Sequence, residues 1–225
     1  MQALYRQSPL LPTYNPPLHR PSRVLLLIGV YSTTLHILLQ LIMFFYKGKY
    51  EFISYNMLNY DWYNGSITVL FFVEHAVWLH VLWTLARPPY HSLVITYIAV
   101  MLIIIAWTME VVVPVEPDPL DLHGKFCIVF IVGCTINCIG SLWLLPGKAQ
   151  GVDPTYKHLI AITTGVAVLA SLIWYGKRVA NGIGTAKNDS FTRFTIHEPS
   201  LEITSYSMYL AGLAAGMDFW ARQTQ

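Results

Sequence analysis

The sequence predicts an all-α, polytopic integral membrane protein with about six transmembrane helices. Hydrophobic residues make up 55% of its 225 residues and charged residues only 12%, whereas a soluble domain has about 25% charged residues. The apolar residues are gathered in long uninterrupted stretches. These stretches do not alternate in polarity and are about twice as long as barrel strands. A helical membrane domain is therefore expected, and a disordered chain or a soluble enzyme is not.

Six stretches are long enough to cross a membrane, because a bilayer core of about 30 Å needs roughly 20 helical residues. The predicted spans are residues 24–46, 66–86, 91–113, 124–146, 158–176 and 201–220. Proline, which lacks a backbone N–H, suits such boundaries. It stands beside most of these ends, at Pro21, Pro88, Pro89, Pro114, Pro146 and Pro199.

The chain divides into an arm at residues 1–23 and a single six-helix transmembrane domain at residues 24–222. The arm is basic, contains no acid and has five prolines, so it reads as an extended segment rather than a targeting helix. An even number of spans puts both termini on one face of the membrane, called side A here. The arm's arginines favour the cytosol or the mitochondrial matrix for side A; the other face is side B.

Ionisable residues inside a span are costly and are functional candidates. His36, Glu74 and His75 lie at one level, each roughly 18 Å from side A at about 1.5 Å per residue. Three interpretations compete for this buried polar cluster. They are a structural His36–Glu74 hydrogen bond between two helices, a proton or substrate site at Glu74, and a haem held between His36 and His75.

No metal site is expected, and lipids are the expected bound molecules. Cys127, Cys134 and Cys138 lie along one face of the fourth span without CxxC spacing or a histidine cluster. Gly133 and Asn137 occupy the same stretch and suit a close helix–helix contact. These five residues are interpreted as packing residues.

Small residues predict close packing of two further helices. Gly212 and Gly216 form a GxxxG pair in the last span, and Ala161 and Gly165 form a similar surface in the fifth. The sequence does not tell whether the partner helices belong to the same chain.

The leading interpretation is a non-catalytic accessory or structural subunit of a larger membrane complex. The sequence contains no GxSxG, HExxH or Walker A motif, so no catalytic residue is assigned and the chain is not expected to be an enzyme. The arm is expected to dock on other membrane protein subunits. The expected setting is the mitochondrial inner membrane, in a respiratory-type assembly. A net charge of +2 makes nucleic acid an unlikely partner.

The alternative is a stand-alone six-span lipid-handling or transport protein of endomembranes. The span spacing, Glu110 with the Val113-Pro114-Val115 run, His123-Gly124, Glu202 and Asp218-Phe219 are similar to the damage-regulated autophagy modulator family of lysosomal and Golgi membrane proteins. That resemblance implies six spans and an endomembrane location. No functional residue is carried over from it.

Overall fold

A computed structural model describes residues 21–46, 53–85, 91–113, 122–144, 154–180 and 197–223. These residues are helical almost throughout and contain no strand, which confirms the all-α prediction. The helices are α1 (Arg23–Phe45), α2 (Ile53–Asn59), α3 (Asp61–Leu85), α4 (His91–Val112), α5 (Leu122–Leu144), α6 (Pro154–Ala180) and α7 (His197–Gln223). The arm predicted at residues 1–23 lies outside the described residues up to residue 20.

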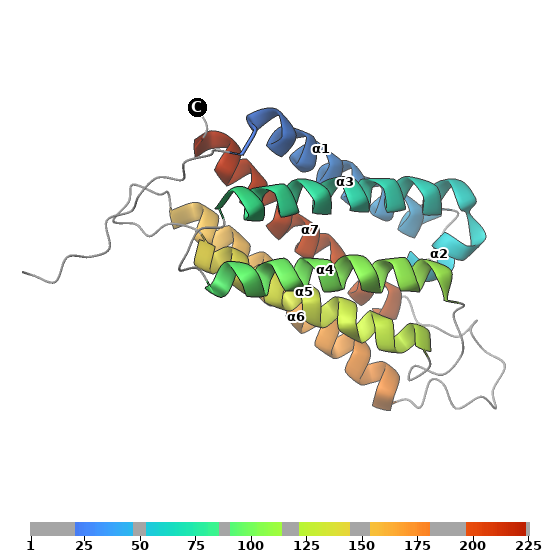
Figure 1. Ribbon diagram of the computed structural model, residues 1–225. Coiled ribbons are helices and arrows are strands. Elements are labelled where there is room, and N and C mark those ends of the chain that lie inside the picture. Colours follow the sequence, from blue (N-terminus) through green and yellow to red (C-terminus); the bar gives the residue numbers. More distant parts are fainter. Residues whose placement is uncertain are drawn as a thin grey trace, which may run out of the picture.

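Five helices, α1, α3, α4, α5 and α6, are long and apolar enough to cross a membrane. Successive long helices run in opposite directions, so the amino-terminal end of α1 lies beside the carboxyl-terminal end of α7 (Figure 1). Their outward faces carry large apolar side chains, such as Ile28 and Leu35 on α1 and Leu172 on α6. An integral membrane protein is the class that these faces indicate.

The sixth predicted span corresponds to α7, which has 27 residues but a lower hydropathy than the other long helices. It packs between α1 and α6 (Figure 1). Over residues 199–221 only Thr204 is exposed. Because its neighbours shield it, α7 can carry serines and tyrosines where a lipid-facing helix would need leucines.

The bounds of the helices depart from the predicted spans near the end of the bundle where α2 lies. The seven-residue α2 was not predicted, and α3 begins at Asp61 rather than at residue 66. The backbone N–H groups of Tyr63 and Asn64 donate to the Tyr60 carbonyl and start α3. Asp61 then stands in the first turn, where the helix dipole favours an acid.

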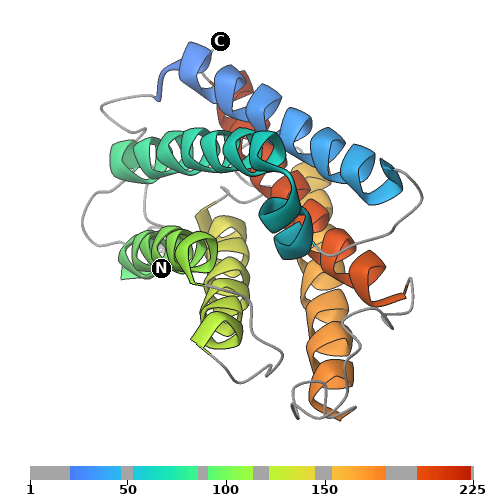
Figure 2. The same cartoon turned by 90° about the vertical axis from the view of Figure 1, so that its right-hand side faces the viewer.

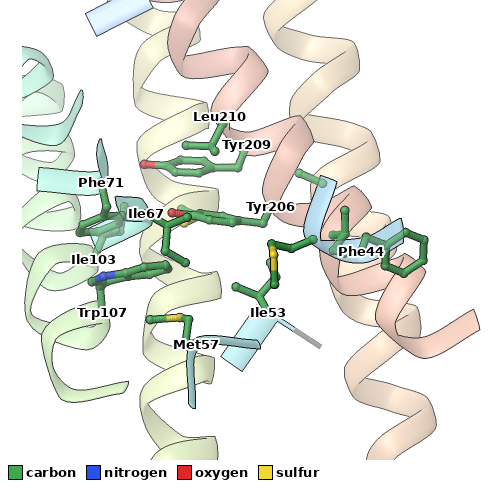
Figure 3. Packing of buried hydrophobic residues seen from close by; sticks show 14 of the residues in the cluster. Phe44, Ile53, Met57, Ile67, Phe71, Ile103, Trp107, Tyr206, Tyr209 and Leu210 are labelled. Carbon is green, nitrogen blue, oxygen red and sulfur yellow. The ribbon is translucent and has the colours of Figure 1, made fainter. Parts of the chain in front are cut away.

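The interior holds two apolar clusters, one toward each end of the bundle. One includes Leu26, Trp78 and Phe219, and the other includes Phe71, Trp107 and Tyr206. In the second cluster the rings of Tyr206 and Tyr209 project from α7 beside those of Phe71 and Trp107 (Figure 3). His36 on α1, and Glu74 and His75 on α3, lie between the residues that these two helices contribute to the two apolar clusters.

Candidate functional site

The structure brings His36, Glu74 and His75 together, and all three side chains are fully buried. His36 Nδ1 of α1 lies 3.0 Å from Glu74 Oε1 of α3. His75 Nδ1 lies 3.8 Å from the same oxygen. The basic groups that come within 4.0 Å of the carboxyl in the described residues are these two imidazoles. A carboxyl in this position depends on His36 for its main hydrogen bond.

His75 takes part in a chain of hydrogen bonds that crosses three helices. Its Nδ1 donates to the Phe71 carbonyl at 2.8 Å, so its neutral Nε2 is an acceptor. The Tyr209 hydroxyl donates to that Nε2 at 2.9 Å and accepts from Asn137 Nδ2 at 3.2 Å. Asn137 Oδ1 accepts from Trp78 Nε1 at 2.9 Å. In this series of hydrogen bonds every donor atom carries a hydrogen and every acceptor atom has a free lone pair.

The two histidines do not suit a haem. A bis-histidine haem needs two imidazole nitrogens that face the iron. Both ring nitrogens of His75 already have partners, Phe71 and Tyr209, and His36 Nδ1 is held by Glu74. The geometry agrees with the hydrogen-bonded interpretation of the His36–Glu74 pair, while any functional role of the cluster stays a prediction.

The predicted packing glycines contact other helices of this same chain. A Cβ added at Gly133 would lie 2.7 Å from Ile103 Cγ1 of α4, and one added at Gly212 would lie 2.9 Å from Thr163 Oγ1 of α6. A Cβ at Gly216 would lie 3.2 Å from the Trp78 ring of α3. Gly165 differs, because an added Cβ there would meet nothing within 4 Å. The surface predicted at Ala161 and Gly165 faces outward and packs on no described helix.

A cleft lies between α5 and α6, with α7 as its floor and α2 and the end of α4 at its mouth. The two helices diverge toward that mouth (Figure 2). The cleft has a cavity volume of about 90 Å³. It is therefore a narrow slot, wider than a packing defect and too thin for a bulky rigid ligand.

The acidic side chains that line the cleft stand at its mouth, whereas its walls mix apolar side chains with serine and threonine hydroxyls. Asn64, Glu110, His123 and Glu202 lie near the helix ends on the side where α2 lies. Glu202 Oε2 accepts the backbone N–H of Ile53 at 2.8 Å and so ties α7 to the start of α2. No lysine or arginine is found among the described residues that line the cleft.

Three polar atoms on residues that line the cleft are buried and have no hydrogen-bond partner among the described residues. They are Glu110 Oε1, Trp107 Nε1 and the Tyr206 hydroxyl oxygen. Trp107 is 3% exposed and Tyr206 is 6% exposed. Buried polar groups are normally paired, because an unpaired one costs about 1–3 kcal/mol. These atoms belong to α4 and α7, on residues that line the cleft.

Sequence reasoning missed this cleft, although it had noted three of the residues at its mouth. In the sequence, Glu110 and Glu202 are ionisable residues in or near spans, and both of them and His123 belong to the family resemblance, but the three are far apart along the chain. Ionisable residues near one end of three different spans were the available signal.

The three cysteines, interpreted as packing residues, all line the cleft: Cys134 and Cys138 are buried and Cys127 is half-buried. Within the described ranges, no group of three or more His, Cys, Asp or Glu side chains is arranged for a metal ion.

The fold defines the class of the protein as an all-α polytopic membrane protein with a polar-mouthed cleft inside its helical bundle. Comparison of the chain with protein-family models, curated proteins and solved structures finds no match.

Proposed function

We propose that the chain is a lipid-handling membrane protein that binds an amphiphile in the cleft between α5 and α6. The observation that carries this proposal is the polarity gradient along the cleft. The acidic groups Glu110 and Glu202 stand at the mouth, near one membrane surface, and no acidic residue lines the inner part of the cleft. The threonine hydroxyls farther in, those of Thr135 and Thr164, donate to carbonyls of their own helices. A lipid oriented as in a bilayer has the same order, with its head at the surface and its chain toward the midplane.

The mouth favours a head group that donates hydrogen bonds. Glu110 and Glu202 supply carboxylate acceptors there, and the Glu110 Oε1 atom has no partner among the described residues. A phosphate that faced these acids would find no lysine or arginine among the described residues that line the cleft to balance its charge. An amine or hydroxyl head group would fit, and an amine would also bring the complementary charge.

Two matched valines test the proposal. Val168 lines the cleft, whereas Val166, two residues away on α6, is exposed on the outer face. Val168→Trp should fill the slot and Val166→Trp should leave it open, because side chains two positions apart on a helix point in nearly opposite directions. The lipids that stay bound to each purified protein in mild detergent are measured by native mass spectrometry.

The proposal expects a retained lipid in the unchanged protein and in Val166→Trp, and its loss in Val168→Trp. Added long-chain amine should bind more tightly than diacylglycerol, and diacylglycerol more tightly than phosphatidylglycerol. Equal lipid retention in the two tryptophan variants would remove the cleft as the binding site. A preference for phosphatidylglycerol would overturn the assignment of the head group.

The second candidate function is the accessory subunit of a respiratory-type complex in the mitochondrial inner membrane. It is favoured by the proline-rich, acid-free arm at residues 1–23, most of which lies outside the described residues. Deletion of residues 2–20 should loosen the chain from other membrane subunits without unfolding the helices. Native mass after extraction in mild detergent distinguishes the candidates. A mass well above 25.5 kDa with other chains present favours a subunit, and a monomer that carries lipid favours the first proposal.

A further inference from the structure

Two polar atoms of the His36–Glu74 pair and one of a neighbouring tyrosine are buried and have no hydrogen-bond partner among the described residues. They are His36 Nε2, Glu74 Oε2 and the hydroxyl oxygen of Tyr206. The His36 and Tyr206 rings are 5.4 Å apart at their centroids and meet edge to face. The pair therefore uses one atom of each residue for its own hydrogen bond and leaves the other atom of each available.

Tyr206 is shared between this pair and the cleft. Its ring contacts His36 on one side, and the residue also lines the cleft. Trp107 stands in a similar position: its ring is 6.3 Å from that of His36, and it lines the cleft as well. These two aromatic residues stand between the cleft and the His36–Glu74 pair.

Charge balance limits the states of the pair. Glu74 carboxylate with protonated His36, and Glu74 acid with neutral His36, are both neutral overall. Loss of the shared proton would leave a net negative charge inside the bundle, and such a charge is costly away from water. Neighbouring titratable groups are His75 on α3, Tyr206 and Tyr209 on α7, and, on the cleft side of Tyr206, Cys134 on α5 and Glu110 on α4. Among these, His75 is already committed to Phe71 and Tyr209.

We propose that the His36–Glu74 pair is a proton-exchange site that the cleft reaches through Tyr206. No hydrogen bond joins the Tyr206 hydroxyl to the pair in the structure, so the transfer requires this side chain to turn toward the pair or a water molecule to stand between them. When the pair then releases its proton, the Tyr206 hydroxyl takes up a proton on one side and gives one to the cleft on the other. The tyrosine stays neutral, and the pair carries one negative charge until it is protonated again. Uptake follows the reverse path. An occupant of the cleft would close this path. The inference uses the same cleft as the proposed function but requires no particular lipid, and the two can fail separately.

Dicyclohexylcarbodiimide tests the site directly. This apolar reagent adds to a protonated carboxylic acid, and rearrangement gives a stable N-acylurea that peptide mass spectrometry assigns to one residue. The delipidated protein is treated in detergent from acidic to alkaline pH. We expect labelling at Glu74 that falls about tenfold per pH unit on the alkaline side, as the protonated fraction of a carboxyl does. Glu74→Gln should lose this label, and Val166→Trp should keep it.

The access route is tested with the cleft-filling variant. Deuterium exchange of the Glu74 carboxyl, followed by infrared spectroscopy, should be severalfold slower in Val168→Trp than in Val166→Trp. Equal exchange rates in the two tryptophan variants would overturn the proposal. Tyr206→Phe adds a measurement in a protein that keeps its aromatic wall. Deuterium exchange of the Glu74 carboxyl, followed by infrared spectroscopy against Glu74→Gln, should slow severalfold, and an unchanged rate would exclude Tyr206 as the relay. If lipid binding fails while Glu74 is labelled as expected, only the proposed function is lost.

Discussion

The Tyr209 hydroxyl of α7 donates a hydrogen bond to His75 Nε2 of α3 at 2.9 Å. Because His75 Nδ1 donates to the Phe71 carbonyl, the Tyr209 proton points toward the imidazole and its lone pair faces Asn137 of α5. One hydroxyl thus joins three helices. Within a bundle surrounded by lipid, such bonds compensate for the weak hydrophobic attraction between helices.

Tyr209→Phe should destabilise the protein because it leaves His75 Nε2 and Asn137 Nδ2 unpaired while it keeps the buried ring. A buried polar group without a partner costs about 1–3 kcal/mol, and hydrogen bonds between membrane helices contribute about 0.6–2 kcal/mol. A loss of about 1–2 kcal/mol is therefore expected in the free energy of unfolding, measured by denaturation in mixed micelles. Tyr97→Phe is the matched control, since Tyr97 is exposed on α4. Similar losses in both variants would contradict the proposed role of Tyr209.

The His36–Glu74 pair should behave as a mutually dependent unit. His36→Leu leaves a buried carboxyl without its main partner, and removal of one member of a buried pair costs about 3–5 kcal/mol. The variant His36→Leu/Glu74→Leu removes both polar groups and should be more stable than His36→Leu alone. A double-mutant cycle on the free energy of unfolding checks this expectation. Additive losses from the two single substitutions would show that the pair is not coupled.

Hydropathy and helix geometry account for what the sequence predicted well. The prediction that His36 and Glu74 lie at one depth depends only on the constant rise of a helix. In the structure His36 Nδ1 lies 3.0 Å from Glu74 Oε1. The outlines of the long helices follow from the same apolar stretches. Burial of α7 could not be predicted in this way, because its low hydropathy has meaning only once α1 and α6 surround it.

The cleft depends on tertiary geometry that no local pattern encodes. Its width is set by how far α5 and α6 diverge, and its polar mouth joins Glu110, His123 and Glu202 from three helices. The face of α5 that carries the cysteines reads from sequence as a small-residue packing surface. Part of it packs closely, since Gly133 contacts Ile103 and Cys134 and Cys138 belong to the second apolar cluster, but all three cysteines also line the cleft. Spacing alone does not distinguish small residues that pack on another helix from small residues that line a cleft.

Gly133→Ala should destabilise the contact between α4 and α5. Its Cβ would lie 2.7 Å from Ile103 Cγ1 and 3.2 Å from the Ala99 carbonyl oxygen, and the backbone of α4 cannot yield as a side chain can. Overpacking of this kind costs about 1–3 kcal/mol. Gly165→Ala is the control on α6, where an added Cβ meets nothing and alanine favours the helix. Melting temperatures in detergent should fall for the first variant and not for the second; the opposite order would refute the close α4–α5 packing.

The three native cysteines should report the depth of the cleft through their order of alkylation. Cys127 is half-buried, whereas Cys134 and Cys138 are 8% and 5% exposed, and the axial distance from Cys127 to Cys134 is about 10 Å. N-ethylmaleimide should therefore modify Cys127 first and Cys138 last, as read from the masses of peptides sampled over time. Val168→Trp should slow the two deeper cysteines more than Cys127, because its indole would fill the slot, and Val166→Trp should slow none of them. Modification of all three at one rate would mean that the reagent reaches α5 from the lipid side or through general opening of the bundle. In that case the cleft would not be the route by which an amphiphile enters.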